Sequence, residues 1–213
     1  MRKIFLATLF AMMIGLQSFC GAEATIESSC LGGKETIVYP IVHTGNSAVD
    51  KKINRVINGI TQNFLMELKN DRRELGINIT VESENFAVKC NGAANSNILS
   101  IIIWQSKYGS NGPAHPTNYS HALNFDLTTG ERLTTNDLAK FGYADKDTLF
   151  QELLTKLRAY VAARNIQKMS SVDSVKSLPE NFYFDEDFHL HFLFEQNSIA
   201  HYAVGSIDID MDE

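Results

Sequence analysis

The segment from Asn97 to Arg132 constrains the fold of this chain more than any other. It begins with the run ILSIIIW at residues 98–104, the most apolar stretch outside the N-terminus. A run of seven residues rich in β-branched and aromatic types is too short for a globular helix and is typical of a buried strand. The run therefore predicts a central strand that is covered on both faces.

A loop and a second strand follow this central strand. Residues 109–116 read GSNGPAHP, which is typical of a loop, and residues 119–127 read YSHALNFDL. The near-regular alternation of the second run predicts a strand with one face toward a core and the other toward water. Gly130 then predicts a turn, because glycine adopts positive φ without a steric penalty.

Two segments have the periodicity of amphipathic helices. Apolar residues recur at spacings of three and four between Ser47 and Lys69, and again from about Asp147 to Asn165. Shorter strand-like stretches occupy residues 34–43, 77–89, 181–184, 188–194 and 205–211. These elements predict an α+β fold, with a mostly antiparallel sheet of about six strands and two long helices packed on one face.

The N-terminus reads as an export signal. Arg2 and Lys3 precede an apolar stretch, and residues 22–24 form an A-x-A cleavage site. We therefore expect residues 1–24 to be a signal peptide and residues 25–213 to be a single α+β domain. This domain would have an N-terminal strand-helix-strand portion at 25–95 and a C-terminal portion at 96–213.

The exported protein is predicted to be periplasmic or secreted. No segment after the signal is long and apolar enough for a transmembrane helix. A lipid anchor at Cys20 is the less favoured alternative, because bulky Phe19 stands where lipoprotein signals have small residues.

The charge balance favours some partners over others. The chain has 25 acidic and 19 basic residues, which give a formal net charge of −6. Such a protein repels nucleic acid and anionic membrane surfaces and attracts basic proteins. Solubility alone also explains a modest negative charge, so the charge argues against nucleic acid as a ligand but does not identify a partner.

Cys30 and Cys90 remain once the signal is removed. An even pair in an oxidising compartment predicts one disulfide, which would contribute about 4 kcal/mol in the chain-entropy model. A reactive thiol pair is not favoured, because there is no C-x-x-C motif and the only basic neighbour is Lys89.

Motifs of known catalysts are absent from the sequence. It contains no G-x-S-x-G, H-E-x-x-H, P-loop or dinucleotide fingerprint, so we expect neither enzymatic activity nor a cofactor. His189 and His191 share a predicted strand face and would need a third ligand, such as His43 or His201, to hold a transition metal. A solvated strand face is the favoured interpretation, and no metal site is predicted.

The last predicted strand has an alternating acidic face. Asp208, Asp210 and Asp212 alternate with apolar residues. We interpret these carboxylates as a solvated edge that discourages edge-to-edge aggregation.

Several motifs together resemble a known family. The apolar strand, the loop with Ala114-His115 and the run LNFDLTTGERLTTNDL at 123–138 look like the extracytoplasmic domain of RsiV-type anti-sigma factors. This domain of unknown function also occurs in PdaC-type peptidoglycan deacetylases. The run IAHYAVG at 199–205 resembles the closing motif of the same family. The catalytic deacetylase domain has no counterpart here, so the resemblance implies no deacetylase activity.

The resemblance implies a binding protein, because RsiV-type ectodomains bind lysozyme. We predict an exported, non-enzymatic domain that recognises a cell-envelope or host protein, with a basic lysozyme-like enzyme as the sharpest candidate. The alternative is binding of peptidoglycan or carbohydrate fragments, with stacking on Trp104 and on Tyr108 or Tyr119. The predicted contact surface is the loop from Lys107 to Tyr119, whose aromatic and polar side chains suit recognition: Tyr108, Asn111, His115, Asn118 and Tyr119.

Overall fold

The computed structural model of the protein describes residues 24–31, 37–75, 79–91, 97–109, 115–166 and 172–213. The first part of this chain contains β1 (Thr25–Leu31), β2 (Ile37–His43), α1 (Ser47–Leu75), β3 (Ile79–Asn91), β4 (Asn97–Gly109), β5 (Thr117–Asp126) and β6 (Arg132–Leu133). The second part contains the 3-10 helices η2 (Thr135–Phe141), η3 (Val172–Ser174) and η4 (Tyr202–Val204), the helix α2 (Lys146–Ala163), and the strands β7 (Phe182–Phe184), β8 (Leu190–Phe194) and β9 (Ile207–Asp210).

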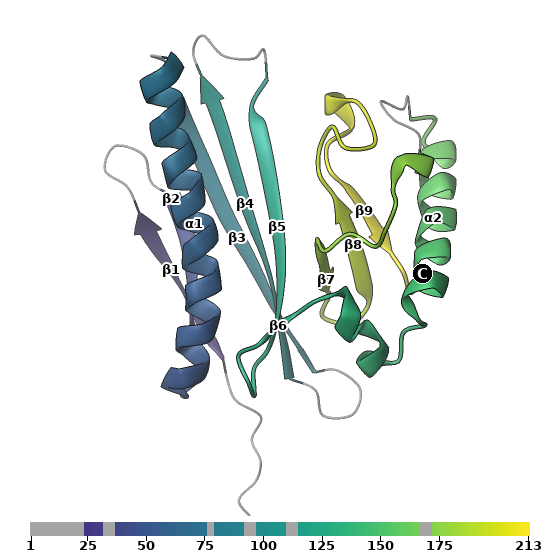
Figure 1. The fold of residues 1–213 in the computed structure, drawn as a ribbon, viewed down its shortest axis with the longest axis horizontal. Coiled ribbons are helices and arrows are strands. Elements are labelled where there is room, and N and C mark those ends of the chain that lie inside the picture. The colour runs from purple at the N-terminus through teal and green to yellow at the C-terminus, as the bar shows by residue number, and fades with distance from the viewer. Residues whose placement is uncertain (1–23, 32–36, 76–78, 92–96, 110–114, 167–171) are drawn as a thin grey trace, which may run out of the picture.

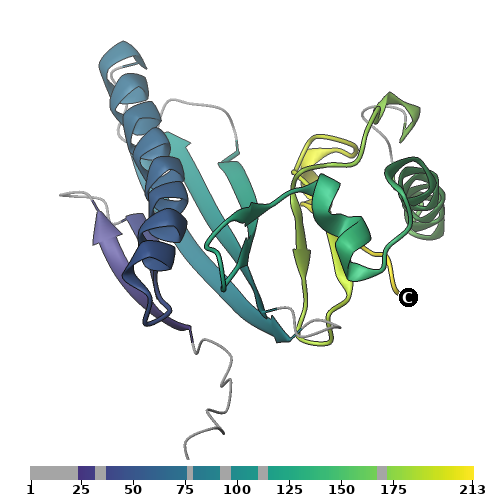
Figure 2. The same ribbon diagram turned by 60° about the horizontal axis from the view of Figure 1, so that its bottom comes forward.

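The predicted α+β class is confirmed, but the layout differs from the one expected. The described strands form three antiparallel sheets with the orders β1-β2, β3-β4-β5-β6 and β7-β8-β9, rather than one sheet of about six strands. The helices α1 and α2 lie on opposite sides of the molecule (Figures 1 and 2), so they do not share one face. Each helix has its own core, because the aromatic strands β7 and β8 supply a second apolar surface for α2.

Two elements extend beyond the predicted limits. β4 continues to Gly109 because residues 105–109 remain paired with β3, and residues 105–107 also pair with β5. α1 continues to Leu75, beyond the predicted end at Lys69. β1 was not predicted, since TIESSCL is largely polar and mostly exposed; its pairing with β2 along its whole length forms the strand.

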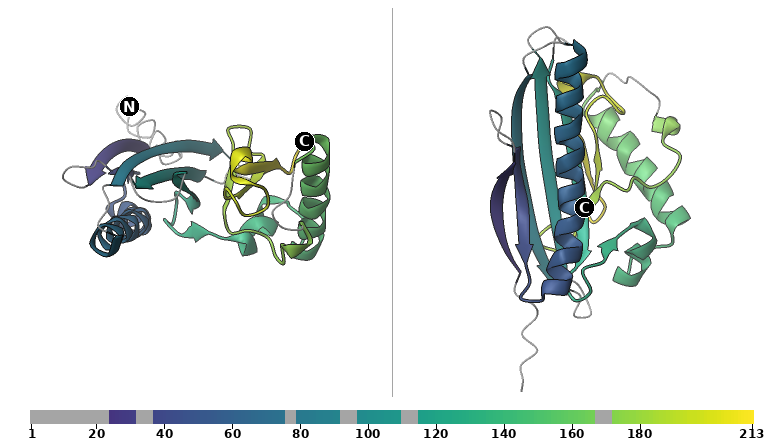
Figure 3. Two further views of the ribbon diagram at one scale, coloured as in Figure 1. Left: turned by 90° about the horizontal axis from the view of Figure 1, so that it is seen from above. Right: turned by 60° about the vertical axis from the view of Figure 1, so that its left-hand side comes forward.

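The apolar stripe of α1 covers the first part of the molecule. Val49, Ile53 and Ile57 of α1 pack on apolar residues of β2, β4 and β5, and Phe64 and Leu68 pack on Ile37 and Ile79. Seen from above, α1 lies beneath these strands, and the three-stranded sheet stands between them and α2 (Figure 3). None of the described helices is long and apolar enough to span a membrane.

The predicted turn at Gly130 is confirmed and fits closely against α1. Gly130 has φ of +72°, and a Cβ added there would lie 3.0 Å from the carbonyl oxygen of Val49. The Nζ of Lys52 donates a hydrogen bond to the carbonyl of Thr129 at 3.0 Å. The turn between β5 and β6 is thereby held at the first turns of α1.

Buried hydrogen bonds join the two parts of the molecule. Ser100 Oγ donates to Asn124 Oδ1 at 2.6 Å, and the backbone N–H of Phe184 donates to Ser100 Oγ at 2.9 Å. Asn124 Nδ2 donates to the carbonyl of Phe182 at 2.7 Å. β7 therefore lies against β4 and β5 through side-chain hydrogen bonds rather than through a continuous backbone ladder.

Gln105 is a buried amide on the face of β4 that α1 covers. Its side chain is fully buried, and neither its Nε2 nor its Oε1 has a hydrogen-bond partner among the described residues. An unsatisfied buried polar group costs about 1–3 kcal/mol.

We expect Gln105→Met to raise the free energy of unfolding by about 1 kcal/mol, because methionine fills a similar volume without a polar group to desolvate. Urea unfolding followed by circular dichroism measures the change. The matched control is Gln151→Met on the exposed face of α2, for which no more than about 0.5 kcal/mol is expected. A loss of stability in Gln105→Met would show that the Gln105 amide is satisfied in solution.

Candidate functional site

The loop after β4 meets the closing motif at one end of the molecule. The ring of His115 stacks on the ring of Tyr202, with 4.5 Å between centroids and an interplanar angle of 17°. Asn118 Nδ2 donates to Gln196 Oε1 at 2.5 Å, and Gln196 Nε2 donates to the carbonyl of Tyr202 at 2.6 Å. Two segments that are far apart in the sequence, the loop with His115 and the segment around Tyr202, are thus in direct contact.

A cleft of about 310 Å³ lies where these segments meet. It is lined by His115, Pro116, Thr117, Asn118, Gln196, Asn197 and Tyr202. The Oδ1 of Asn118 is buried and accepts no hydrogen bond from the described residues, so it is an unsatisfied acceptor in the wall of the cleft. The lining combines an aromatic pair with amide groups, which suits contact with a polar protein surface.

Tyr119 lies on the other face of β5, against α1. Its hydroxyl donates to Glu67 Oε1 at 2.6 Å, and its ring packs edge-on against Phe64. Burial and then the hydrogen bond to Glu67 raise the pKa of Tyr119. This half-buried side chain is held inside the fold, on the face of the sheet that α1 covers.

Lys107 contacts the same carboxylate of α1 as Tyr119 does. Its Nζ contacts Glu67 and lies 2.7 Å from Asp71 Oδ2, and only 14% of its side chain is exposed. Burial alone would lower the pKa of Lys107, but the hydrogen bonds to Asp71 and Glu67 raise it above its ordinary range. Lys107 therefore anchors β4 to α1 and is not a free cation of the predicted loop.

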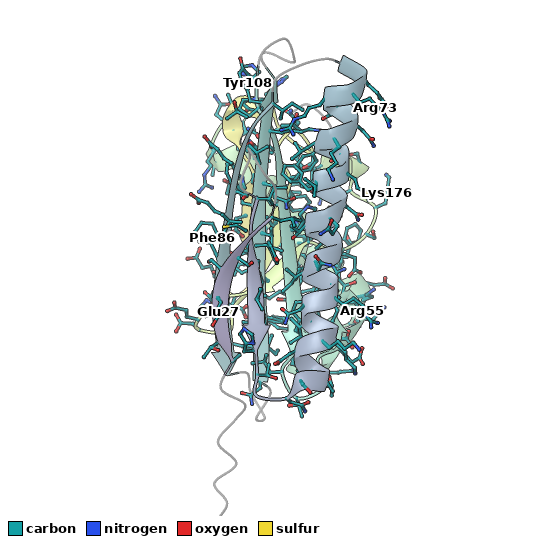
Figure 4. The ribbon with its side chains drawn as sticks, turned by 90° about the vertical axis from the view of Figure 1, so that its left-hand side faces the viewer. Glu27, Arg55, Arg73, Phe86, Tyr108 and Lys176 are labelled. Atoms are coloured by element: carbon teal, nitrogen blue, oxygen red, sulfur yellow. The ribbon has the colours of Figure 1, made fainter. Side chains whose placement is uncertain are left out.

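Tyr108 projects from the opposite face of β4. It is 44% exposed, and it shares that face with half-buried Trp104, while Phe86 is 56% exposed on the neighbouring strand β3. Figure 4 shows Phe86 pointing away from α1. Trp104 ends the run that predicts a strand covered on both faces, yet it is only half-buried and belongs to none of the apolar cores formed by the described residues.

The structure thus divides the predicted contact residues. His115 and Asn118 lie together at the cleft, Tyr108 and Tyr119 lie on opposite faces of the sheet, and Asn111 lies outside the described residues. Gln196 and Tyr202 belong to the cleft but were not predicted as contact residues. The signal for Tyr202 was present, since it stands in the closing motif.

His189 and His191 face carboxylates. His191 Nδ1 lies 3.2 Å from Asp208 Oδ1, and His189 Nδ1 lies 3.6 Å from Asp185 Oδ2. Burial alone would raise the pKa of Asp185, but the hydrogen bond from the His189 backbone and the two imidazoles lower it. Within the described ranges, no group of three or more His, Cys, Asp or Glu side chains could hold a metal ion.

Cys30 lies on β1 with an exposed, free thiol, so the predicted disulfide with Cys90 is not formed in this structure. The side chain of Cys90 lies outside the described part of the chain, as do residues 1–23 of the predicted signal peptide.

Comparisons with known proteins complete this description. No family model matches the sequence, and no curated protein matches it. The solved structures that are similar to this chain include one from Bacteroides fragilis and one from Pseudomonas aeruginosa. Both are DUF3298 family proteins.

The first, from Bacteroides fragilis, is 17% identical, with 89% of this chain and 88% of that protein covered and a TM-score of 0.49. The second, from Pseudomonas aeruginosa, is 12% identical, with 90% of each chain covered and a TM-score of 0.47. Neither comparison assigns a ligand or an activity to this protein.

Proposed function

We propose that this chain is an exported, non-enzymatic binding protein of the RsiV-like kind, which holds a protein partner at the cleft between residues 115–118 and 196–202. The stacking of His115 on Tyr202 supports this proposal most directly. It joins the two sequence motifs that carry the RsiV resemblance in one solvent-accessible place.

The chemistry of the cleft supports binding. An aromatic pair offers a rigid apolar contact, and the amides of Asn118 and Gln196 offer hydrogen bonds around it. His115 and Tyr202 are the ionisable side chains among the described lining residues, and no carboxylate, lysine or cysteine accompanies them.

A basic, lysozyme-like enzyme of the cell envelope or of a host is the sharpest candidate partner. The net charge of −6 would accelerate the encounter with a basic protein and orient it. The cleft residues would then decide how long the complex lasts, since most affinity differences at an interface appear in the dissociation rate.

Surface plasmon resonance with a chicken-type lysozyme tests this function, using protein expressed without the predicted signal peptide. We expect binding that persists at moderate salt and that Tyr202→Ala or His115→Ala weakens by about tenfold or more, as for removal of a central contact. His43→Ala is the matched control, because His43 is exposed on distant β2.

Binding seen only at low salt would reflect charge attraction alone. An equal loss of affinity in His43→Ala would contradict the cleft as the contact site. No binding in either salt condition would reject lysozyme as the partner.

A second candidate is binding of peptidoglycan or other carbohydrate fragments on the open face of β3 and β4. The exposed rings of Phe86 and Tyr108 beside half-buried Trp104 support it, because sugar rings stack on aromatic side chains. Trp104 is the one tryptophan of the chain, so quenching of intrinsic fluorescence by soluble muropeptides would report binding at this face. An unchanged spectrum, and equal retention of wild type and Trp104→Ala on peptidoglycan, would reject this alternative.

A further inference from the structure

A second cavity, of about 450 Å³, lies between α2 and the outer edge of β9. It shares no residue with the cleft at His115 and Tyr202. Its lining comes from the helix, the edge strand and the end of the chain: Lys156, Ala159, Tyr160, Arg164, His191, Asp208, Ile209, Asp210 and Glu213. Figures 1 and 3 show β9 as the strand of its sheet that runs toward the chain end beside α2.

The outer edge of β9 presents unpaired backbone groups. β9 is an edge strand of the three-stranded sheet, which has the order β7-β8-β9. The N–H of Met211, just after β9, points toward β8 and donates to the carbonyl of Leu190 at 2.8 Å. Because backbone groups alternate sides along a strand, Asp208 and Asp210 direct their N–H and C=O away from β8. None of the described residues forms a backbone hydrogen bond with these four groups.

The cavity follows this edge on both faces of the strand. Ile209 is buried on the side of α2, whereas Asp208 and Asp210 lie with His191 on the other side. The cavity touches Ile209 on one face of β9 and Asp208 and Asp210 on the other, so it passes along the backbone between them. The unpaired N–H and C=O groups therefore border the open space.

The opposite wall is a row of side chains along α2. Lys156, Tyr160 and Arg164 are spaced by four residues, which places them on one side of the helix. The guanidinium of Arg164 lies over the Tyr160 ring at 3.7 Å, and the Nζ of Lys156 donates to the main-chain oxygen of Glu213. Ala159 contributes a methyl group beside this row.

We propose that an extended segment of a partner protein binds in this groove and adds a fourth strand to the β7-β8-β9 sheet at the edge of β9. Its backbone would pair with the N–H and C=O groups of Asp208 and Asp210. Its alternate side chains face two different walls. Acidic side chains suit the wall with Lys156 and Arg164, and basic side chains suit the face with Asp208 and Asp210.

The charges favour a different chain over a second copy of this protein. Antiparallel pairing of two β9 edges would place the carboxylates of Asp208 and Asp210 in one copy beside those of the other. Like charges directly opposed across strands are destabilising, and acidic edges are a known device against self-pairing. A segment that alternates basic and acidic residues avoids this repulsion, because its basic side chains would lie on the face with Asp208 and Asp210.

The test uses three blocked hexapeptides, which alternate Arg with Glu, Arg with Thr, and Glu with Thr. We titrate each into isotopically labelled protein and follow the backbone amides of Asp208 and Asp210 by NMR. Saturable shifts of both amides are expected, with the Arg-Glu peptide binding about threefold or more tightly than either other peptide, as for one added charge pair. Absence of shifts at both amides with all three peptides at millimolar concentration would overturn the proposal.

Two variants at one position separate backbone pairing from side-chain effects. Asp208→Pro removes the outward N–H, which β8 does not use, and proline is tolerated at such edge positions. Asp208→Ala keeps that N–H but loses the carboxylate that contacts His191 and accepts from Tyr183. We expect Asp208→Pro to bind the Arg-Glu peptide about tenfold more weakly than Asp208→Ala.

Equal affinity in the two variants would overturn the proposal. Should Asp208→Pro fail to fold, the peptide provides the same test, because N-methylation of alternate residues removes the donors on one edge. Two peptides are made, one N-methylated at its odd residues and the other at its even residues. One of these two peptides must abolish the amide shifts, and shifts that persist with both peptides contradict strand addition.

Discussion

Replacing Asn124 with alanine is expected to lower the free energy of unfolding by about 3 kcal/mol, since it breaks a buried polar network. Asn124 is 1% exposed, and it binds Ser100 Oγ on one side and the carbonyl of Phe182 on the other. The substitution leaves both of these buried groups short of a partner and also leaves a cavity.

Urea unfolding of Asn124→Ala measures this effect, with Asn136→Ala as the matched control. Asn136 is exposed on η2, so its removal should cost no more than about 0.5 kcal/mol. In a double-mutant cycle with Ser100→Ala, the two losses should be less than additive by about 1 kcal/mol, because both substitutions break the same hydrogen bond. Additive losses, or equal stability of Asn124→Ala and Asn136→Ala, would contradict the network as drawn.

The second large effect is expected at Lys107, where methionine should destabilise the protein by about 2 kcal/mol. Lys107 is 14% exposed and faces both Glu67 and Asp71. Its removal leaves two carboxylates close together with no cation between them. The value stays below that of a fully buried pair, because Glu67 is 42% exposed and water screens it.

The matched control is Lys140→Met, which breaks an ion pair with Asp137 in which the lysine is 70% exposed. That change should cost no more than about 0.5 kcal/mol. Adding Glu67→Gln to Lys107→Met should recover part of the loss, since it removes one of the two opposed charges. Failure to recover any stability would contradict repulsion between the Glu67 and Asp71 carboxylates as the cause of the loss.

The pKa of Lys107 determines how this contribution depends on pH. A raised folded-state pKa means that the stabilisation is fully present below the unfolded-state value of about 10.4 and declines as pH rises through the folded-state value. The difference in stability between wild type and Lys107→Met should therefore stay constant from about pH 7 to pH 9. A difference that shrinks within this range would contradict the raised pKa.

Much of the secondary structure could be predicted from periodicity. The apolar residues of α1 recur at helical spacing, and the run at 98–104 has the composition of a buried strand. Local patterns of this kind reflect which face of an element must leave water. β1 was missed because its residues are mostly exposed and its formation depends on pairing with β2.

The candidate site could be predicted only in part. The loop with His115 was visible as a Gly- and Pro-rich segment, and Tyr202 stood in a recognisable motif. Their contact could not be predicted, because stacking of two rings far apart in the sequence depends on where β5 and η4 begin in space. The separation of Tyr108 from Tyr119 could not be predicted either, because it depends on the pairing register. Tyr119 pairs with Gln105 and shares its face of the sheet, whereas Tyr108 is three residues further along β4 and lies on the opposite face.

The sequence by itself determined the α+β class, the two amphipathic helices and the turn at Gly130, because each depends on residue spacing or on one backbone conformation. The tertiary structure alone decided that the helices cover different sheets, that the loop with His115 meets Tyr202 at one cleft, and that the edge of β9 stands open beside α2. The physical reason is that local periodicity specifies which side of an element is buried. It does not specify the partner that buries that side, which is settled only when strands pair and cores pack across the whole chain.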